Sequence, residues 1–137
     1  MENHKKKVLV FGTFDRIHPG HRYFLAKAAS CGDSLTVVVA RDITVKEVKG
    51  AFPGHNEQKR LEAVSSLPEV DKAVLGNLKD KYKVIEAEQP DIICLGYDQK
   101  VFADNLAQEL EKRGIDAEIY RIGALEPERY KSSRLRS

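Results

Sequence analysis

The chain has 137 residues, of which 42% are hydrophobic and 32% charged, and its formal net charge at pH 7 is +2. This length and composition predict a soluble globular protein with a single core, and they exclude an intrinsically disordered chain. So small a net charge excludes a general affinity for polyanions. Any anion site must therefore form locally.

The N-terminal segment imitates a secretory signal only in its basic start. The apolar run that follows, VLVFG, has about five residues, fewer than the ~7 that such a signal requires. No stretch approaches the roughly 18 apolar residues of a membrane span. Cys31 and Cys94 lack the spacing of a zinc or redox pair, and we expect both to be small buried residues in a reducing compartment. These features predict a cytoplasmic protein that binds no membrane.

Short runs rich in β-branched residues alternate with amphipathic stretches along the chain. In chain order they predict a strand over 7–12, a helix over 20–30, a strand over 34–41, a loop over 42–53, a helix over 57–67, a strand over 70–76, a helix over 81–89 that Pro90 stops, a strand over 91–96, a helix over 105–114 and a strand over 116–122. The strands are almost continuously apolar, as in parallel sheets that are buried on both faces. We therefore predict an α/β fold, a Rossmann-like doubly wound parallel five-stranded sheet, in a single domain over 1–137.

In such sheets, ligands bind beyond the carboxyl ends of the strands. The loop after the first strand, GTFDRIHPGH, contains residues that a plain turn does not need. Pro19 suits the first position of a helix, and Gly20 removes a side chain from its first turn. His18 and His21 are three residues apart, so both imidazoles can face the helix N-terminus, where backbone N–H groups and the helix dipole attract anions.

Each of these residues also has a simpler interpretation. A single histidine near a helix start is most often a cap or a surface residue, and two histidines at this spacing could form half of a zinc site. No further set of His, Cys, Asp or Glu has matching spacing. Asp15 is expected to hold the loop by accepting hydrogen bonds from backbone N–H groups rather than to act in catalysis.

The ten residues from Gly12 to His21 resemble the signature of the nucleotidyltransferase superfamily that includes the cytidylyltransferases and phosphopantetheine adenylyltransferase. The resemblance implies that the HxGH motif, with His18 and His21, binds a nucleoside triphosphate and stabilises the transition state. It also implies that Gly12, Thr13, Phe14 and Gly20 contribute to the nucleotide site.

Two further groups of cations follow the second predicted strand, one in the predicted loop over 42–53 and one in the next predicted helix. Lys46 and Lys49 are typical of solvated surface lysines, but the resemblance implies that they contact phosphates. In the helix that Asn56 is expected to cap, the resemblance implies a functional arginine. Either Lys59 or Arg60 could take that role.

The remaining candidates follow the fourth strand and lie near the C-terminus. Gly96 would let the backbone approach a ligand, Tyr97 could equally be a packing residue, and Asp98 could accept from a ribose hydroxyl or a base amine. Ser132 and Ser133, in the sequence KSS, match a Ser/Thr motif that contacts nucleotide phosphates in the superfamily.

Three longer stretches, VVVARDITVKEVKG, VDKAVLGNLKDK and PDIICLGYDQ, resemble the archaeal FAD synthases. This resemblance implies transfer of AMP from ATP to FMN with Mg²⁺, giving FAD and pyrophosphate, with no metal ligand from the chain itself. Such relatives are often homodimers, and the sequence leaves the oligomeric state of this chain open. Phe52 and Tyr130 are candidates for stacking on the flavin, or are ordinary packing residues.

Three other functions remain open from the sequence. The first is CTP-dependent transfer to a small alcohol phosphate such as glycerol 3-phosphate, which would use the same loop. The second is a nucleotide-binding regulator that has lost turnover. The third, an RNA-binding module, is disfavoured because aromatic residues do not interleave with a basic stripe, and we expect no nucleic acid as a partner.

Overall fold

The structure is a computed structural model that describes residues 5–96 and 100–123. Its elements are, in chain order, β1 (Lys7–Gly12), α1 (Pro19–Ala29), β2 (Ser34–Val39), α2 (Asp42–Lys49), α3 (Glu57–Ser65), β3 (Lys72–Leu75), α4 (Lys83–Glu88), β4 (Ile92–Gly96), α5 (Lys100–Lys112) and β5 (Glu118–Ile122). Within the described residues, no helix combines the length and apolarity that crossing a bilayer requires.

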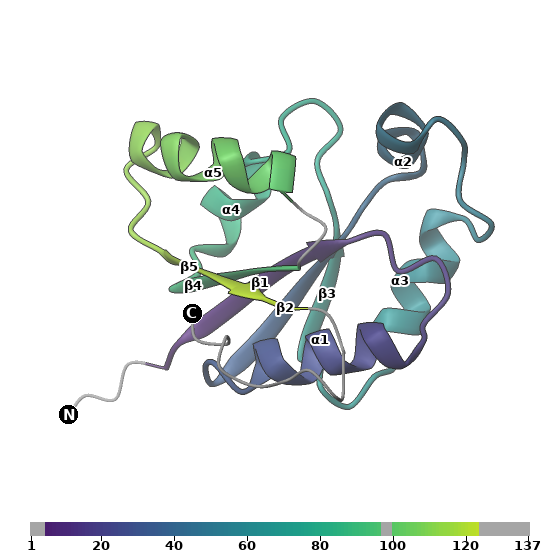
Figure 1. Ribbon diagram of the computed structural model, residues 1–137, viewed down its shortest axis with the longest axis horizontal. Helices are drawn as coiled ribbons and strands as arrows, with labels where there is room; N and C mark the ends of the chain where they lie inside the picture. Colours follow the sequence, from purple (N-terminus) through teal and green to yellow (C-terminus); the bar gives the residue numbers. More distant parts are fainter. Residues whose placement is uncertain (1–4, 97–99, 124–137) are drawn as a thin grey trace.

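All five strands are parallel, in the order β3-β2-β1-β4-β5 (Figure 1). The chain winds outward from β1 to β3, and then crosses back to place β4 on the other side of β1. This reversal puts a topological switch point between β1 and β4, where doubly wound sheets bind ligands. The predicted Rossmann-like α/β fold with a five-stranded parallel sheet is confirmed.

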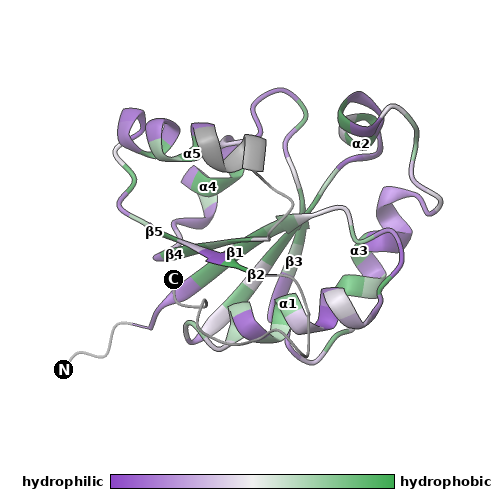
Figure 2. Ribbon diagram, viewed as in Figure 1, coloured by the Kyte–Doolittle hydropathy of each residue, from purple (hydrophilic) through white to green (hydrophobic). Residues whose placement is uncertain are grey.

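The helices form one layer on each face of the sheet. In Figure 1, α1 and α3 lie below the sheet, while α4 and α5 lie above it. Successive residues of β1 serve the two layers: Val8 and Val10 pack with Leu25 of α1, whereas Leu9 packs with Leu106 of α5. The apolar strands and the polar outer sides of the helices are visible in Figure 2. This alternation accounts for the almost continuous apolar sequence of the central strands.

The edge strand β5 differs from the prediction that the strands are buried on both faces. Ile119 and Tyr120 are 36% and 44% exposed, because a strand at the edge has a neighbour on one side only. The cysteines agree in part: Cys94 is fully buried, and burial raises the pKa of its thiol, but Cys31 is only half-buried. Their Sγ atoms lie 3.9 Å apart.

The segment 42–53, predicted as a loop, contains the helix α2, so this prediction was wrong. The backbone N–H of Asp42, which the helix cannot pair internally, donates to Glu57 Oε1 at 2.8 Å. Gly50 ends the helix in the left-handed conformation with φ +86°. These two terminal interactions offset the low helix propensity of the β-branched residues in between.

An aspartate directly before each of three strands fixes the register of the sheet. The carboxylates of Asp33, Asp71 and Asp91 accept from the backbone N–H groups of Lys6, Leu35 and Lys7 at 2.7, 2.7 and 2.8 Å. In return, the backbone N–H groups of these three aspartates donate to the carbonyls of Lys6, Leu35 and Lys7, at 2.8, 2.9 and 2.9 Å. Each pair extends a strand-to-strand ladder by one step at the end of the sheet opposite the ligand-binding edge.

We predict that Asp71→Ala lowers the free energy of unfolding by about 1–3 kcal/mol, because the N–H of the fully buried Leu35 loses its acceptor. The matched control is Asp116→Ala, an exposed aspartate two residues before β5, which should change it by no more than about 0.5 kcal/mol. Urea denaturation followed by circular dichroism measures both. Equal effects would contradict a register role for Asp71.

Candidate active site

Two histidines form the cap of α1, at the carboxyl end of β1. His18 is the N-cap, and its Nδ1 accepts from the backbone N–H of Gly20 at 3.1 Å. The backbone N–H of His18 donates in turn to Nδ1 of His21 at 3.3 Å. The two rings are stacked with centroids 3.8 Å apart. A neutral imidazole that accepts at Nδ1 carries its proton on Nε2, so the cap sets both rings in the Nε2–H tautomer.

The structure explains why a proline and a glycine follow His18. Pro19 is the first residue of α1, as predicted. A Cβ on Gly20 would lie 3.0 Å from Cε1 of His18, so glycine leaves the imidazole its place over the first turn. His18 is exposed and lines an open hollow along α1 of about 630 Å³, together with Tyr23 and the ion pair of Arg22 and Glu69.

The ring of Phe14 packs against His21. Its backbone has φ +51°, an uncommon value for a residue other than glycine, and its side chain is only 4% exposed. The ring contacts His21 edge-on, with centroids 5.2 Å apart. A Cβ on Gly12 would lie 2.5 Å from the ring of Phe14, so glycine is required by this close approach rather than by a turn. Strain at Phe14 is thus balanced by burial of its ring.

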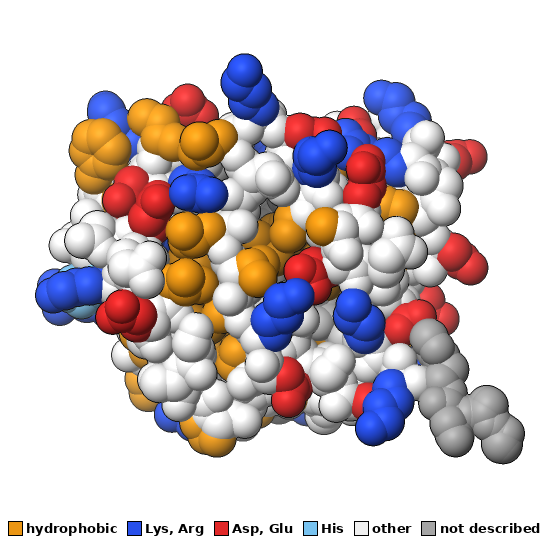
Figure 3. Space-filling view, turned by 180° about the vertical axis from the view of Figure 1, so that it is seen from behind, with side chains coloured by type: hydrophobic (Ala, Val, Ile, Leu, Met, Phe, Trp, Pro, Cys, Tyr) orange, Lys and Arg blue, Asp and Glu red, His pale blue; other side chains and the backbone are white. Residues whose placement is uncertain are grey.

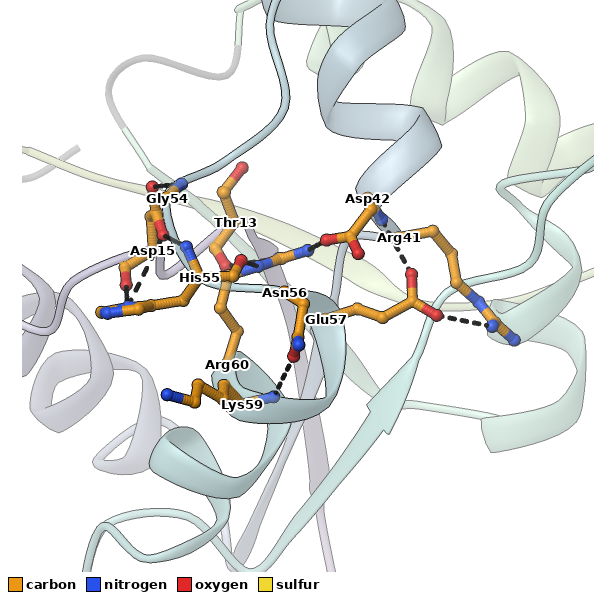
Figure 4. A network of polar contacts seen from close by, with 10 residues as sticks. All are labelled: Thr13, Asp15, Arg41, Asp42, Gly54, His55, Asn56, Glu57, Lys59 and Arg60. Carbon is orange, nitrogen blue, oxygen red and sulfur yellow. Dashed lines mark hydrogen bonds and ion pairs between the residues drawn. The ribbon is translucent and has the colours of Figure 1, made fainter.

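Asp15 ties the same loop to a segment 39 residues further on (Figure 4). Its carboxylate accepts from the backbone N–H groups of Gly54 and His55 at 2.7 and 2.8 Å, and its carbonyl lies 2.8 Å from Nδ1 of His55. The Gly54 and His55 hydrogen bonds hold the pKa of the Asp15 carboxyl below its ordinary value, against the opposing effect of burial. The prediction that Asp15 holds backbone is confirmed, although the backbone it holds belongs to another loop.

Arg60 lies at the centre of the polar network in Figure 4, and its side chain is fully buried. It donates to the carbonyls of Thr13 and His55, at 2.9 Å each, and to Oδ1 of Asp42 at 2.7 Å. The neighbouring Lys59 is exposed, and its backbone N–H donates to Asn56 Oδ1, which caps α3 as predicted. Of the two cations that the sequence left open, Arg60 is therefore the one built into the site.

Sequence reasoning missed the residues that extend this network to β2 and β3. Glu57 accepts from the backbone N–H of Asp42 and, at 3.2 Å, from Nη1 of Arg41. Nε of Arg41 donates to the carbonyl of Gly76 at 2.8 Å. A carboxylate in the first turn of α3 and the Arg41–Asp42 pair shortly after β2 were the available signals. Together these contacts hold the carboxyl ends of β1, β2 and β3 in one assembly.

The structure brings some of the predicted site residues together and leaves others apart. Gly12, Thr13, Phe14, His18, Gly20 and His21 lie in one loop and helix turn. Lys46 and Lys49 are exposed on α2, which stands beyond the carboxyl ends of the strands (Figure 1). Gly96 ends β4 beside β1, at the switch point. Tyr97, Asp98, Tyr130, Ser132 and Ser133 lie outside the described residues.

Residues 9–137 match the sequence model of the family described as Cytidylyltransferase-like. The chain belongs to the cytidylyltransferase-like family. This cytidylyltransferase-like chain is 49% identical over 116 residues to the FAD synthase of Methanosarcina barkeri (strain Fusaro / DSM 804), covering 85% of this chain and 82% of the relative. It is also 49% identical over 122 residues to the FAD synthase of Ferroglobus placidus (strain DSM 10642 / AEDII12DO), covering 88% and 78%.

A solved structure agrees with the fold of this cytidylyltransferase-like chain. The lipopolysaccharide core biosynthesis protein from Thermoplasma volcanium GSS1 superposes with a TM-score of 0.85 at 40% identity, covering 90% of this chain and 100% of that one. The resemblance to cytidylyltransferase-like proteins and to archaeal FAD synthases, predicted from the sequence, is confirmed by these comparisons.

Adjacent substitutions in α3 of this cytidylyltransferase-like protein test the role of Arg60. Arg60→Met removes the three donated hydrogen bonds and should lower the free energy of unfolding by at least about 2 kcal/mol. Lys59→Met, at an exposed position, should change it by no more than about 0.5 kcal/mol. Thermal and urea unfolding measure both. A larger loss for Lys59→Met than for Arg60→Met would contradict the assignment.

Proposed function

We propose that this chain is an FAD synthase, which transfers the adenylyl group of ATP to FMN and releases pyrophosphate. The observation that carries the proposal is the first turn of α1, in which both histidines are set to present Nε2–H groups where a helix N-terminus attracts phosphate. The sequence identity of the chain to two FAD synthases supports adenylyl transfer to FMN as the particular reaction. The described residues build one sheet with its helices, which supports assigning 1–137 to a single nucleotidyltransferase domain.

The reaction makes modest demands on the protein. A phosphate oxygen of FMN attacks the α-phosphorus of ATP in line, a new P–O bond forms, and the bond to the departing pyrophosphate breaks. Positioning and charge stabilisation dominate such transfers, and no covalent enzyme intermediate is needed. His18 and His21 would donate from Nε2 to the oxygens on which negative charge grows, and the N-terminus of α1 would add its dipole.

Other residues would support the two histidines. Phe14 and Gly12 would position His21, because the buried Phe14 ring packs against it and Gly12 leaves room for that ring. Thr13 would offer its backbone to the nucleotide, held from behind by Arg60. Lys46 or Lys49 would neutralise the FMN phosphate and the departing pyrophosphate.

The adenosine would lie across the switch point. Gly96 at the end of β4 would allow close approach to the backbone there, followed by Tyr97 and Asp98 at the base and ribose. Ser132 and Ser133 would contact phosphates. The assignments of these last four residues rest on the sequence resemblance.

We assign Mg²⁺ to the nucleotide substrate, where phosphate oxygens bind it. Across 5–96 and 105–123, no three His, Cys, Asp or Glu side chains lie together in a way that could hold a metal ion. We therefore assign no residue of these two segments to the ion.

A substrate panel tests the proposed reaction. The purified chain is incubated with Mg²⁺ and either ATP or CTP, together with FMN or glycerol 3-phosphate, and pyrophosphate release and products are measured. We expect FAD from ATP with FMN alone. A CDP-linked product from glycerol 3-phosphate would establish the cytidylyltransferase alternative, and nucleotide binding without pyrophosphate release would establish a regulator.

Two substitutions at His18 separate its capping role from its donor role. In His18→Asn, an amide oxygen can still accept from the Gly20 N–H, since asparagine is a good N-cap, but nothing replaces Nε2–H. We expect kcat to fall at least about a hundredfold, with the melting temperature unchanged. His18→Gln, which keeps a donor near the Nε2 position but loses the cap, should retain more activity and lose about 1 kcal/mol of stability. Near-normal turnover by His18→Asn would remove this histidine from the mechanism.

A further inference from the structure

An exposed aromatic side chain follows the helix that carries the two proposed phosphate-binding lysines. Phe52, between α2 and α3, is 59% exposed. Ile43 and Val48 of α2 are 44% and 75% exposed. Figure 3, which views the molecule from behind, shows hydrophobic side chains gathered at the corner where α2 lies, with cationic side chains beside them. A phenyl ring left this open to water beside a ligand-binding edge suggests a partner for its face.

The backbone around Phe52 is fixed on both sides. On the N-terminal side, the backbone N–H of Gly50 donates to the carbonyl of Lys46 at 2.8 Å and ends α2. On the C-terminal side, the Gly54 N–H is bound to the carboxylate of Asp15, two residues after Phe52. Pro53 further restricts the conformation of Phe52. The phenyl ring therefore stands on a turn whose two ends are fixed. The hydrogen bond from Gly54 to Asp15 links this turn to the loop that leads to His18.

A cation lies over one face of the ring. Nζ of Lys46 is 5.5 Å from the centroid of Phe52, and Lys49 lies one helical turn further along α2. An apolar ring face next to ammonium groups matches a ligand that joins a planar aromatic system to a dianionic phosphate. FMN has this combination, and its ribityl chain separates the ring from the phosphate. The isoalloxazine ring must therefore bind away from the reacting atoms, and Phe52 follows the helix that carries Lys46 and Lys49.

We propose that the face of Phe52 opposite Lys46 is the stacking platform for the isoalloxazine ring of FMN, with the Lys46 ammonium group where the ribityl chain leads toward the phosphate. This inference rests on the proposed function and adds to it the place where the acceptor binds. Ile43 and Val48 would extend the apolar surface around the ring. The competing occupant of the same corner is a second copy of the chain, which fluorescence, kinetics and sedimentation distinguish from FMN.

The chain contains no tryptophan, so Phe52→Trp introduces a single fluorescent reporter at the proposed platform. We expect FMN to quench its emission in a saturable manner, because the indole and isoalloxazine rings would stack. Glycerol 3-phosphate should not quench it. The control variant is Tyr120→Trp, a half-exposed position on the edge strand β5, which should show only the linear quenching of collision and absorption. Equal, unsaturable quenching in both variants would overturn the proposal.

Steady-state kinetics of FAD formation give the second test. Phe52→Ala should raise the KM for FMN at least about tenfold, the effect expected when a stacking aromatic is removed, and should leave the KM for ATP and the melting temperature unchanged. An unchanged KM for FMN, with FAD still produced, would overturn the platform but leave the proposed function intact. Absence of FAD from the unmodified chain would instead refute the proposed function. Dissociation of a dimer by Phe52→Ala, seen in analytical ultracentrifugation with FMN binding unchanged, would assign the corner to a second copy and overturn the proposal.

Discussion

The first turn of α1 must satisfy its own backbone donors and still attract a phosphate. Most helices meet the first need with a hydroxyl or a carboxylate at the N-cap and a carboxylate three residues later. Carboxylates at those positions would place negative charge where the phosphates of a nucleotide must lie. Here Nδ1 atoms of two imidazoles accept the same hydrogen bonds, and the first turn holds no acidic residue. Capping and anion binding are thereby made compatible.

The rest of the site keeps those imidazoles in place. The ring of Phe14 lies under His21, and Asp15 and Arg60 tie the loop to the segment around His55 and to the start of α2. The charge of Arg60 is paired with Asp42, at 2.7 Å. A buried charge with a partner this close adds little to the long-range field. We therefore assign Arg60 to positioning the loop, and attraction of phosphates to the helix N-terminus and to exposed lysines.

Much of the fold follows from the sequence, because its signals are local. Continuous apolar runs rich in β-branched residues predict the strands, and amphipathic patterns predict most helices. The right-handedness of crossover connections then turns their alternation into a parallel sheet. The helix α2 could not be predicted in this way. Half of its eight residues are β-branched, and its first turn depends on Glu57, which is distant along the chain. Interactions between segments far apart in sequence override a weak local propensity.

The candidate site shows the same division. The loop from Gly12 to His21 could be recognised from its residues, because an ordinary strand-to-helix turn does not require glycines, a proline and two imidazoles together. The choice of Arg60 over Lys59 could also be made from the sequence. Arg60 precedes the buried Val64 by four residues and so shares its helix face, whereas Lys59 does not. The exposure of Phe52 had no sequence signal, since it depends on where the chain leaves α2.

The proposed chemistry depends most directly on the protonation pattern of two imidazoles, those of His18 and His21. Long-range proton–nitrogen NMR of the ¹⁵N-histidine-labelled protein at about pH 8, where a typical imidazole is neutral, distinguishes the two tautomers of each ring. Assignments come from His18→Gln and His21→Gln. We predict the Nε2–H tautomer at His18 and His21, and the Nδ1–H tautomer at His55, whose Nδ1 lies 2.8 Å from the carbonyl of Asp15. Addition of ATP with Mg²⁺ should shift the Nε2 resonances of the first two only. An Nδ1–H tautomer at either His18 or His21 would contradict the arrangement of donors that adenylyl transfer requires here.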